Sequence, residues 1–173
     1  FKRKLGPDPA SEIACTIGGV VANNSSGMFC GTEQNTYRTI ASMVLVLPNG
    51  LVIDTGKADA DEILKSKAAG IHDGLISLRD RVRNNPDSVD LIKKLFSIKN
   101  TMGYSVNSFL DFDSPVKILE HLVVGSEGTL AFVAEATFRI VDRSMQLCGA
   151  KGTSSELPIA HIFRDIRPFR IYD

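Results

Sequence analysis

Three clusters of small and polar residues are the part of this 173-residue sequence best suited to chemistry. Residues 8–19 hold Asp-Pro-Ala-Ser and then Thr-Ile-Gly-Gly, residues 23–32 open with Asn-Asn-Ser-Ser-Gly, and residues 125–129 read Gly-Ser-Glu-Gly-Thr. Each cluster gathers backbone N–H groups and hydroxyls with little side-chain bulk, as close approach of a phosphate-rich or flat heteroaromatic ligand requires. The clusters therefore predict a site built largely from backbone. Packing turns and solvated loops are the alternative explanation of each cluster.

The clusters do not match the common glycine motifs. Gly18-Gly19 is no G-x-G-x-x-G, and no glycine loop continues into Gly-Lys-Ser/Thr. Val124 stands where the nucleophile elbow G-x-S-x-G needs its first glycine. A dinucleotide fingerprint, a P-loop and a hydrolase elbow are all excluded, and the residues alone name no catalytic group.

The cysteines and histidines predict no metal site. The three cysteines are widely spaced and form no C-x-x-C, which excludes a disulfide framework, a four-Cys zinc site and an iron–sulfur cluster held by this chain alone. Reduced thiols in a cytosolic protein are the expectation. The three histidines are scattered without H-E-x-x-H or paired spacing. These six residues are Cys15, Cys30, Cys148, His72, His121 and His161.

Composition excludes further classes. The 20 basic residues balance 20 acidic ones, so the sequence lacks the basic excess of a nucleic-acid-binding domain. A hydrophobic content of 43% is ordinary for a soluble globular protein. No apolar run approaches the ~18 residues that a membrane span requires, and no signal peptide is recognisable.

The elements that must position the clusters include one hairpin and one long strand. The β-rich runs 43–47 and 51–53 flank Pro48-Asn49-Gly50, which predicts a β-hairpin. Residues 130–141 predict a strand after the Gly-Ser-Glu-Gly-Thr turn. In that strand Phe132, Ala134, Ala136 and Phe138 are expected to alternate with their neighbours.

Between them the pattern predicts helices. Asp59 or Asp61 is expected to cap the first, and apolar residues recur at helical spacing up to about residue 95. Asn85-Pro86 and Ser114-Pro115 each predict a capped helix start. The tail, residues 142–173, has no sustained period and is interpreted as the start of an incomplete substrate or cap domain.

Taken in order, these motifs resemble the FAD-linked oxidases and dehydrogenases of D-2-hydroxy acids, which have a PCMH-type (vanillyl-alcohol-oxidase-like) FAD-binding domain. The resemblance spans residues 5–141 and includes Lys-Asn-Thr-Met-Gly-Tyr at 99–104. It is closest to the bacterial D-2-hydroxyglutarate and D-lactate dehydrogenase branch, in which the flavin domain is fused to an iron–sulfur domain. It implies an α+β fold, the second subdomain of that FAD-binding domain, with an antiparallel or mixed sheet flanked by helices.

The resemblance also implies which residues bind the cofactor FAD. In the family the Thr-x-Gly-Gly stretch and the Asn-rich loop contact the flavin and its diphosphate, and the Gly-Ser-Glu-Gly-Thr-Leu turn reaches towards the flavin and adenosine. Small residues would let backbone donors reach the diphosphate, and a carboxylate can accept from ribose hydroxyls. Carried over, the FAD-binding residues are Pro9, Ser11, Thr16, Gly18, Gly19, Asn23, Gly27, Glu127, Gly128 and Val133.

The chain also departs from the family. Ala131 replaces a usual glycine, and Phe29 stands where the related branch tends to have cysteine. The first subdomain with its diphosphate loop, the substrate cap and the iron–sulfur module are missing, so the chain resembles a fragment. Residues 1–141 are interpreted as a partial FAD-binding domain. The catalytic base and the cations for the substrate carboxylate would lie in the missing cap.

Three hypotheses follow. The leading one is a fragment of an FAD-dependent enzyme that oxidises a D-2-hydroxy acid of the D-lactate, glycolate or D-2-hydroxyglutarate class. The second is a folded, non-catalytic remnant or interaction module that binds no flavin and self-associates through the face left by the missing subdomain. A weaker third is an anion-binding domain that uses the turn at Gly125. A cytoplasmic location is expected, with peripheral contact to the inner membrane as the alternative for the parent enzyme.

Overall fold

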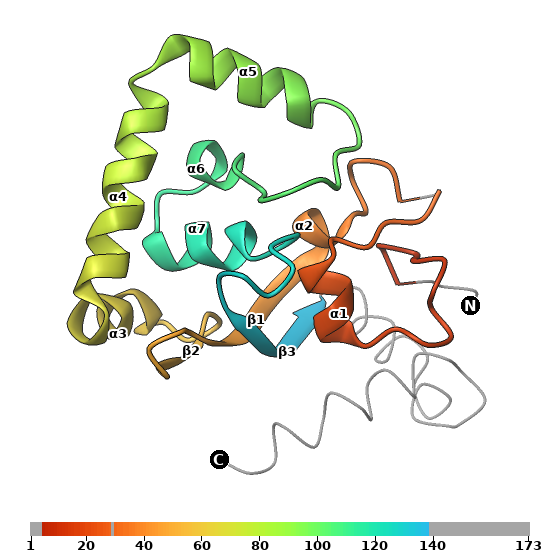
Figure 1. Ribbon diagram of the computed structural model, residues 1–173, viewed down its shortest axis with the longest axis horizontal. Helices are drawn as coiled ribbons and strands as arrows, with labels where there is room; N and C mark the ends of the chain where they lie inside the picture. The colour runs from red at the N-terminus through yellow and green to blue at the C-terminus, as the bar shows by residue number, and fades with distance from the viewer. Residues whose placement is uncertain (1–4, 29, 139–173) are drawn as a thin grey trace.

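The computed structural model describes residues 5–28 and 30–138, and their fold is α+β (Figure 1). A three-stranded sheet carries helices that pack on it and on one another. The predicted tail 142–173 and the last predicted strand residues, 139–141, lie outside the described residues. The elements are α1 (Ile17–Ala22), α2 (Thr36–Thr39), β1 (Ile40–Val46), β2 (Val52–Asp54), α3 (Ala60–Lys67), α4 (Ala69–Arg83), α5 (Pro86–Phe96), α6 (Ser108–Asp111), α7 (Pro115–Leu122) and β3 (Phe132–Phe138).

The sheet is antiparallel, with strand order β2-β1-β3 among the described residues. The predicted hairpin is confirmed: β1 pairs with β2, and Val44 lies opposite Asp54. Gly50 closes the turn with φ +82°, a left-handed conformation that glycine adopts without steric cost. Its amide donates to the carbonyl of Leu47 at 2.8 Å. β3 pairs with the other edge of β1, so the strand that follows the third cluster is held beside the hairpin.

A bulge in β3 changes the alternation that the sequence predicts. Val44 pairs with Glu135 and Leu45 pairs with Val133, so one extra residue lies between them on β3. Because side chains alternate with a period of two, one extra residue moves the earlier part of the strand to the opposite face. Phe138 is therefore fully buried, whereas Phe132 is 69% exposed. The expectation that all four even-numbered residues share a face is wrong at Phe132.

The predicted helix starts are confirmed at two of three positions. The Asn85 side chain accepts from the amide of Ser88 at the start of α5, and Ser114 accepts from Lys117 at the start of α7. Asp59 occupies the N-cap position of α3, but its side chain makes no capping hydrogen bond.

Asp61 has a different role. Its carboxylate accepts from the Ser114 hydroxyl at 2.5 Å and from the Val116 amide at 2.9 Å. It therefore satisfies a free donor at the start of α7 from a different helix.

An arginine of α4 ties the helices together. Arg83 donates to the carbonyls of Phe109 and Phe112 at 2.8 and 2.7 Å and to the Asp113 carboxylate at 2.6 Å. Those carbonyls surround the end of α6, where backbone acceptors lack helical partners. The Arg83 guanidinium also lowers the pKa of Asp113 through its hydrogen bond and its charge.

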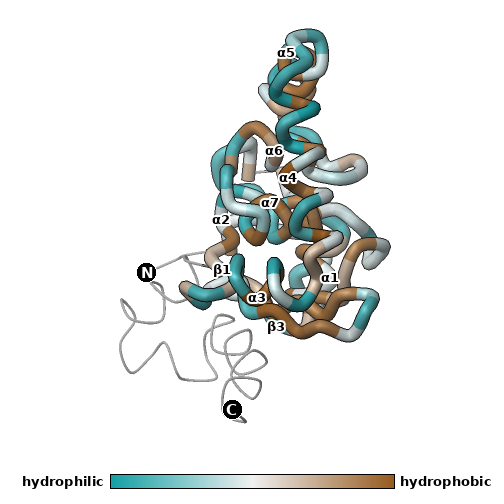
Figure 2. The backbone as a smooth tube through the Cα atoms, turned by 90° about the vertical axis from the view of Figure 1, so that its left-hand side faces the viewer, coloured by the Kyte–Doolittle hydropathy of each residue, from teal (hydrophilic) through white to brown (hydrophobic). Residues whose placement is uncertain are grey.

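The core lies between the sheet and these helices. Its largest fully buried side chains include Phe138, Met43, Leu45 and Ile118. Helix α5 projects from the end of the molecule away from the sheet (Figure 2). Its outward residue Leu91 is 55% exposed, so α5 contributes little to the core.

Candidate functional site

The second and third clusters meet at the end of α1. The amide of Gly125 donates to the carbonyl of Val21 at 3.0 Å, and the amide of Glu127 donates to the carbonyl of Ala22 at 2.9 Å. Residues about a hundred positions apart are thus joined by backbone hydrogen bonds, which do not depend on side-chain type. The Gly-Ser-Glu-Gly-Thr turn therefore lies at the end of α1, beside the Asn-rich loop of residues 23–27.

The N-terminal cluster closes on the same loop. The amide of Gly27 donates to the carbonyl of Pro7 at 2.8 Å. A Cβ on Gly27 would lie 1.7 Å from the carbonyl oxygen of Asp8, so no other residue fits there without moving the backbone. Glycine at this position is required by the packing of the two loops.

A fourth segment, residues 99–105, completes the arrangement. The Lys99 ammonium donates to the carbonyls of Ser26 and Gly27 at 3.2 and 2.6 Å. The Tyr104 hydroxyl lies 2.8 Å from the Thr129 hydroxyl. We call the place where residues 5–27, 99–105 and 125–133 meet the motif junction.

The start of α1 lies against β3. Thr16 is the N-cap, and its hydroxyl accepts from the amide of Gly19 at 3.0 Å. A Cβ on Gly18 would lie 3.0 Å from the carbonyl oxygen of Val133. Val133 is the residue opposite Leu45 beside the bulge, so the bulge sets the carbonyl that Gly18 meets.

The backbone of the motif junction is conformationally unusual. Asp8, Asn24 and Glu127 have φ of 43°, 48° and 51°, and they are the positive-φ non-glycine residues of the described chain. Such residues persist only where their surroundings determine the conformation, and they concentrate at functional sites. All three lie in the clusters that the sequence singled out.

The structure brings most of the residues predicted to bind FAD together around α1. Thr16, Gly19, Asn23, Glu127 and Gly128 are exposed there. Gly18, Gly27 and Val133 are half-buried in contacts within the junction, and Pro9 is buried. Ser11 is exposed in the turn before α1, and the described contacts link its backbone only to its neighbours Ala14 and Cys15.

The glycines differ in what they leave open. At Gly18, Gly27 and Gly125 a Cβ would press against backbone of the chain itself. At Gly103 and Gly128 no described atom beyond the adjoining residues lies within 4 Å of the place that a Cβ would take, so the backbone is open to a partner there. Backbone amides beside exposed hydroxyl and amide side chains suit a flavin nucleotide. The open backbone of the motif junction suits part of FAD. At Gly18, Gly27 and Gly125, packing of the chain against itself explains why the residue is glycine.

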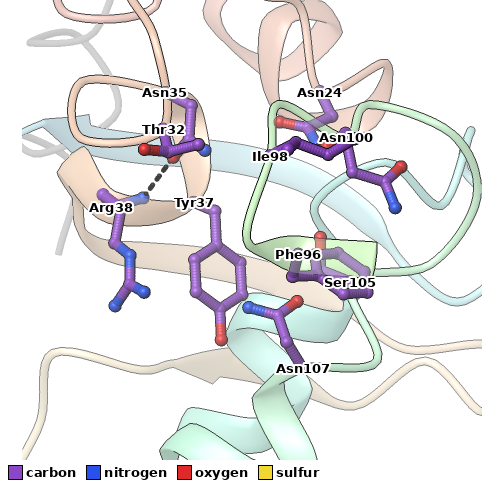
Figure 3. Close-up of a pocket in the computed structure, with 10 residues that line it drawn as sticks. All are labelled: Asn24, Thr32, Asn35, Tyr37, Arg38, Phe96, Ile98, Asn100, Ser105 and Asn107. Atoms are coloured by element: carbon purple, nitrogen blue, oxygen red, sulfur yellow. Dashed lines mark hydrogen bonds between the residues drawn. The ribbon is translucent and has the colours of Figure 1, made fainter. Parts of the chain in front are cut away.

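A small pocket of about 30 Å³ adjoins the junction (Figure 3). Its size suits water molecules rather than a flavin ring. Asn24 and Asn107 are buried, with 4% and 8% of their surface exposed. Their side-chain oxygens have no hydrogen-bond partner among the described atoms. The pocket is lined by Asn24, Thr32, Asn35, Tyr37, Arg38, Phe96, Ile98, Asn100, Ser105 and Asn107.

Sequence reasoning missed this pocket. Its residues come from the Asn-rich loop, from residues 32–38 at the start of α2, and from the end of α5 and the segment after it; no single motif links them. The Tyr37 hydroxyl donates to Asp111 at 2.8 Å, and burial together with that carboxylate raises the pKa of Tyr37. The one sequence signal that points there is a set of four asparagines, Asn24, Asn35, Asn100 and Asn107.

A second buried polar group lies at α7. The Glu120 carboxylate, 1% exposed, accepts from the Thr55 hydroxyl and from the Lys117 ammonium at 3.0 Å. His121 stacks against Phe112 with ring centroids 4.0 Å apart. Burial lowers the pKa of His121 to about 4. These side chains are closed inside the fold, so we assign them to stability rather than to chemistry.

Two features are absent from the part of the chain that the structure describes. Within residues 5–28 and 30–138 no group of three or more His, Cys, Asp or Glu side chains could hold a metal ion. No helix in that part of the chain is long and apolar enough to cross a membrane.

Comparison with known proteins gives the same family over the N-terminal part. Residues 1–56 match the FAD binding domain family. Residues 127–173 match a second family, the acyl-CoA dehydrogenase C-terminal domain, and this match lies mostly outside the described residues. No solved structure matches the chain.

Curated relatives extend the first match. A D-2-hydroxyglutarate dehydrogenase of Haemophilus influenzae is 23% identical over 79% of this chain and 14% of its own length. A D-lactate dehydrogenase of Archaeoglobus fulgidus is 27% identical over 78% of this chain and 18% of its own length. A D-2-hydroxyglutarate dehydrogenase of Xanthomonas citri is 26% identical over the same shares.

The chain therefore spans less than a fifth of the length of these relatives. The matches cover the clusters of the motif junction, and the structure shows those clusters in contact. The chain is therefore similar to FAD-linked dehydrogenases over most of its length, and residues 1–56 match the FAD binding domain.

Proposed function

We propose that this chain is part of an FAD-dependent dehydrogenase that oxidises a D-2-hydroxy acid, of the D-lactate, glycolate or D-2-hydroxyglutarate class. The single observation that carries the proposal is the convergence of the four motif segments into one junction through backbone hydrogen bonds and the Lys99 contacts. The relatives named for D-lactate and D-2-hydroxyglutarate support the substrate class.

Within this proposal the chain's own residues bind and orient the cofactor. Asn23, Glu127 and the open backbone at Gly128 would contact its polar groups, and Thr16 would fix the start of α1 beside them. The packed glycine Gly27 acts by holding the loops close. Bound FAD supplies the hydride acceptor for oxidation of the hydroxyl-bearing carbon. The residues that take the hydroxyl proton are assigned to the remainder of the parent enzyme.

A titration of the purified chain with FAD tests the cofactor proposal. We expect saturable, micromolar binding, seen as quenching of flavin fluorescence. Asn23→Ala should weaken FAD binding without changing the melting temperature, because Asn23 is exposed and its amide bonds only to nearby Ser25. Asn84→Ala is the matched control, since Asn84 is an exposed asparagine at the end of α4. Equal affinity in both variants would contradict the placement of the site.

A chimera tests the substrate class. In it, residues 5–138 replace the matching segment of the Archaeoglobus D-lactate dehydrogenase. The expected result is a flavin-loaded protein whose absorbance bleaches anaerobically with D-lactate, glycolate or D-2-hydroxyglutarate. A chimera that folds but carries no flavin would contradict the cofactor proposal. One that carries flavin but is bleached by none of these acids would contradict the substrate class.

A second candidate is an interaction module that self-associates. It is favoured by exposed apolar side chains beside the Lys99 segment: Met28, Met102 and Ile98 are 88%, 85% and 69% exposed. Side chains of this kind commonly mark a protein–protein contact. Light scattering between about 1 and 100 μM tests it, because a module of this class forms dimers as concentration rises. A monomer throughout that range would exclude it.

We also propose a cytoplasmic location. It is supported by Cys15 and Cys30, which are free thiols in the described part of the chain. Fractionation of the cells that produce the protein tests this, and recovery with the membrane pellet would favour peripheral attachment instead.

A further inference from the structure

Within the residues that the structure describes, the motif junction contains a single cation. Among its residues, 5–27, 99–105 and 125–133, Lys99 is the one basic side chain, and the same segments hold three acidic ones, Asp8, Glu12 and Glu127. A diphosphate brings negative charge to any site that binds it, and lysine serves phosphates as a point charge. A site for a flavin dinucleotide in this part of the chain has Lys99 as its available counter-charge.

The position of the Lys99 ammonium is fixed. It donates to the carbonyl of Ser26 at 3.2 Å and to the carbonyl of Gly27 at 2.6 Å, across 73 and 72 residues of sequence. An ammonium has three N–H groups, so two of them are engaged and one is left to donate elsewhere. Lys99 as a residue is exposed, which leaves that donor open to a ligand.

Its surroundings are those of the proposed cofactor site. The two carbonyls belong to the Asn-rich loop that ends in Gly27, and Gly27 packs on Asp8 of the N-terminal cluster. Beside Lys99 in sequence, Asn100 accepts from the side chain of Asn24 through its carbonyl at 3.5 Å. The ammonium is thus held where the two loops meet, without needing to move when a ligand arrives. Such preorganisation reduces the entropy lost on binding.

From this geometry we propose that Lys99 binds the diphosphate of the flavin dinucleotide. The inference rests on the proposed function and adds a residue that the motif comparison did not assign to the cofactor. Lys99 has two roles in one geometry: two N–H groups position the Asn-rich loop, and the remaining one meets a phosphate oxygen. The charge of the ammonium acts on the same anion.

The test compares Lys99→Met with the control Lys94→Met, which removes an exposed lysine of α5. Three probes are titrated: FAD, ADP and riboflavin, of which riboflavin has no phosphate. Lys99→Met should weaken the binding of FAD and of ADP about tenfold, in line with loss of one charge-assisted hydrogen bond. It should leave riboflavin unchanged. Lys99→Arg should restore most of the loss, and Lys94→Met should match the wild type for every probe.

Salt gives a second readout. An ion contact with a phosphate weakens as salt screens it, so FAD affinity of the wild type should fall with ionic strength. In Lys99→Met that dependence should be shallower. A residue that only shapes the loop would not alter the salt dependence.

The outcomes separate the two claims. If the wild type binds FAD and ADP, but Lys99→Met binds them equally well or loses riboflavin to the same degree, the diphosphate role is overturned and the proposed function stands. An unchanged salt dependence in Lys99→Met overturns it as well. If the wild type binds neither FAD nor ADP, the proposed function fails for this chain, and the role of Lys99 fails with it.

Discussion

The motif junction and the helices that follow the hairpin are held together by different means. In the junction, backbone amides bond to backbone carbonyls of distant segments, as Gly125 does to Val21. Among α3–α7, side chains make the ties: Arg83 reaches the end of α6, and Asp61 reaches the start of α7. Lys99 and Tyr104 add side-chain bonds to the junction. Its contacts depend mainly on which residues are small, whereas the helical part depends on which side chains are present.

The comparison explains where each region tolerates change. A backbone-built junction accepts many side chains on its open surface but none at the positions where two chain segments touch. The helical region accepts glycine-to-alanine changes. It loses stability when a helix cap is removed, or a side chain such as Arg83 that bonds to another segment. Three substitutions and one change of pH distinguish the two regions, and they follow in order of decreasing loss of stability.

Gly125→Ala should give the largest effect. Gly125 has φ +84°, and a Cβ there would lie 2.7 Å from the carbonyl oxygen of Gly103. The left-handed conformation costs alanine about 1–2 kcal/mol. The overlap adds about 1–3 kcal/mol. Together these give an expected loss of about 3 kcal/mol in the free energy of unfolding, measured in urea.

Gly74→Ala is the matched control from the helical region. Gly74 lies inside α4, and no described atom outside the backbone of that helix and the adjoining residues lies within 4 Å of the place that a Cβ would take. It should gain about 0.5–1 kcal/mol, because alanine is the better helix former. If Gly125→Ala and Gly74→Ala lost similar amounts of stability, the junction and the helical region would not differ in their tolerance of a Cβ.

Acid should destabilise the protein through His121. Burial lowers its folded-state pKa to about 4, below an ordinary unfolded value near 6.5. Between these values the unfolded chain binds the proton and the folded one does not, so stability falls as pH drops from about 6.5 to about 4.

Urea unfolding at pH 7 and pH 4.5 measures this effect. We expect His121 to account for about 2 kcal/mol of the loss over that interval. His121→Phe keeps a ring beside Tyr37 and Phe112 and should show a correspondingly shallower pH dependence. The same loss in variant and wild type would exclude His121 as the cause.

Arg83→Ala should cost about 1–2 kcal/mol in the free energy of unfolding, because it leaves carbonyls at the end of α6 without their donor. Arg81→Ala, which removes an exposed arginine of the same helix, should change stability by less than about 0.5 kcal/mol. If both variants unfold at the same urea concentration as the wild type, the hydrogen bonds of Arg83 do not stabilise the helical region.

Asn85→Ala should give the smallest effect. It removes the side-chain amide oxygen that accepts from the Ser88 amide at 3.2 Å, a loss of about 1 kcal/mol. Because α5 projects from the fold, faster amide exchange should appear in α5 first. Asn84→Ala is the control, and equal exchange in the two variants would argue against a capping role.

The helical region and the hairpin could be predicted from local signals. Pro48-Asn49-Gly50, Asn85-Pro86 and Ser114-Pro115 each carry their own turn or cap chemistry, and the structure confirms all three. The face of Phe132 could not be predicted, because a bulge depends on how β3 meets β1 and not on the strand alone. Asp61 bonding to α7 is likewise a tertiary contact without a local signal.

The motif junction was predictable in part. Glycine clusters indicated close backbone approach, but whether a ligand or the chain itself approaches is decided by tertiary packing. At Gly27 the approaching group is the carbonyl of Asp8, whereas at Gly128 the space is open. Lys99 belongs to a recognisable motif, and only the structure shows its bonds to Ser26 and Gly27.

Amide hydrogen exchange of the chain with and without saturating FAD tests whether the motif junction forms the cofactor surface. The motif junction should gain protection in three stretches, residues 16–27, 99–105 and 125–130, while α4 and α5 stay unchanged. Protection confined to the helical region, or none in the junction when FAD is bound, would contradict the claim that these segments form the cofactor surface.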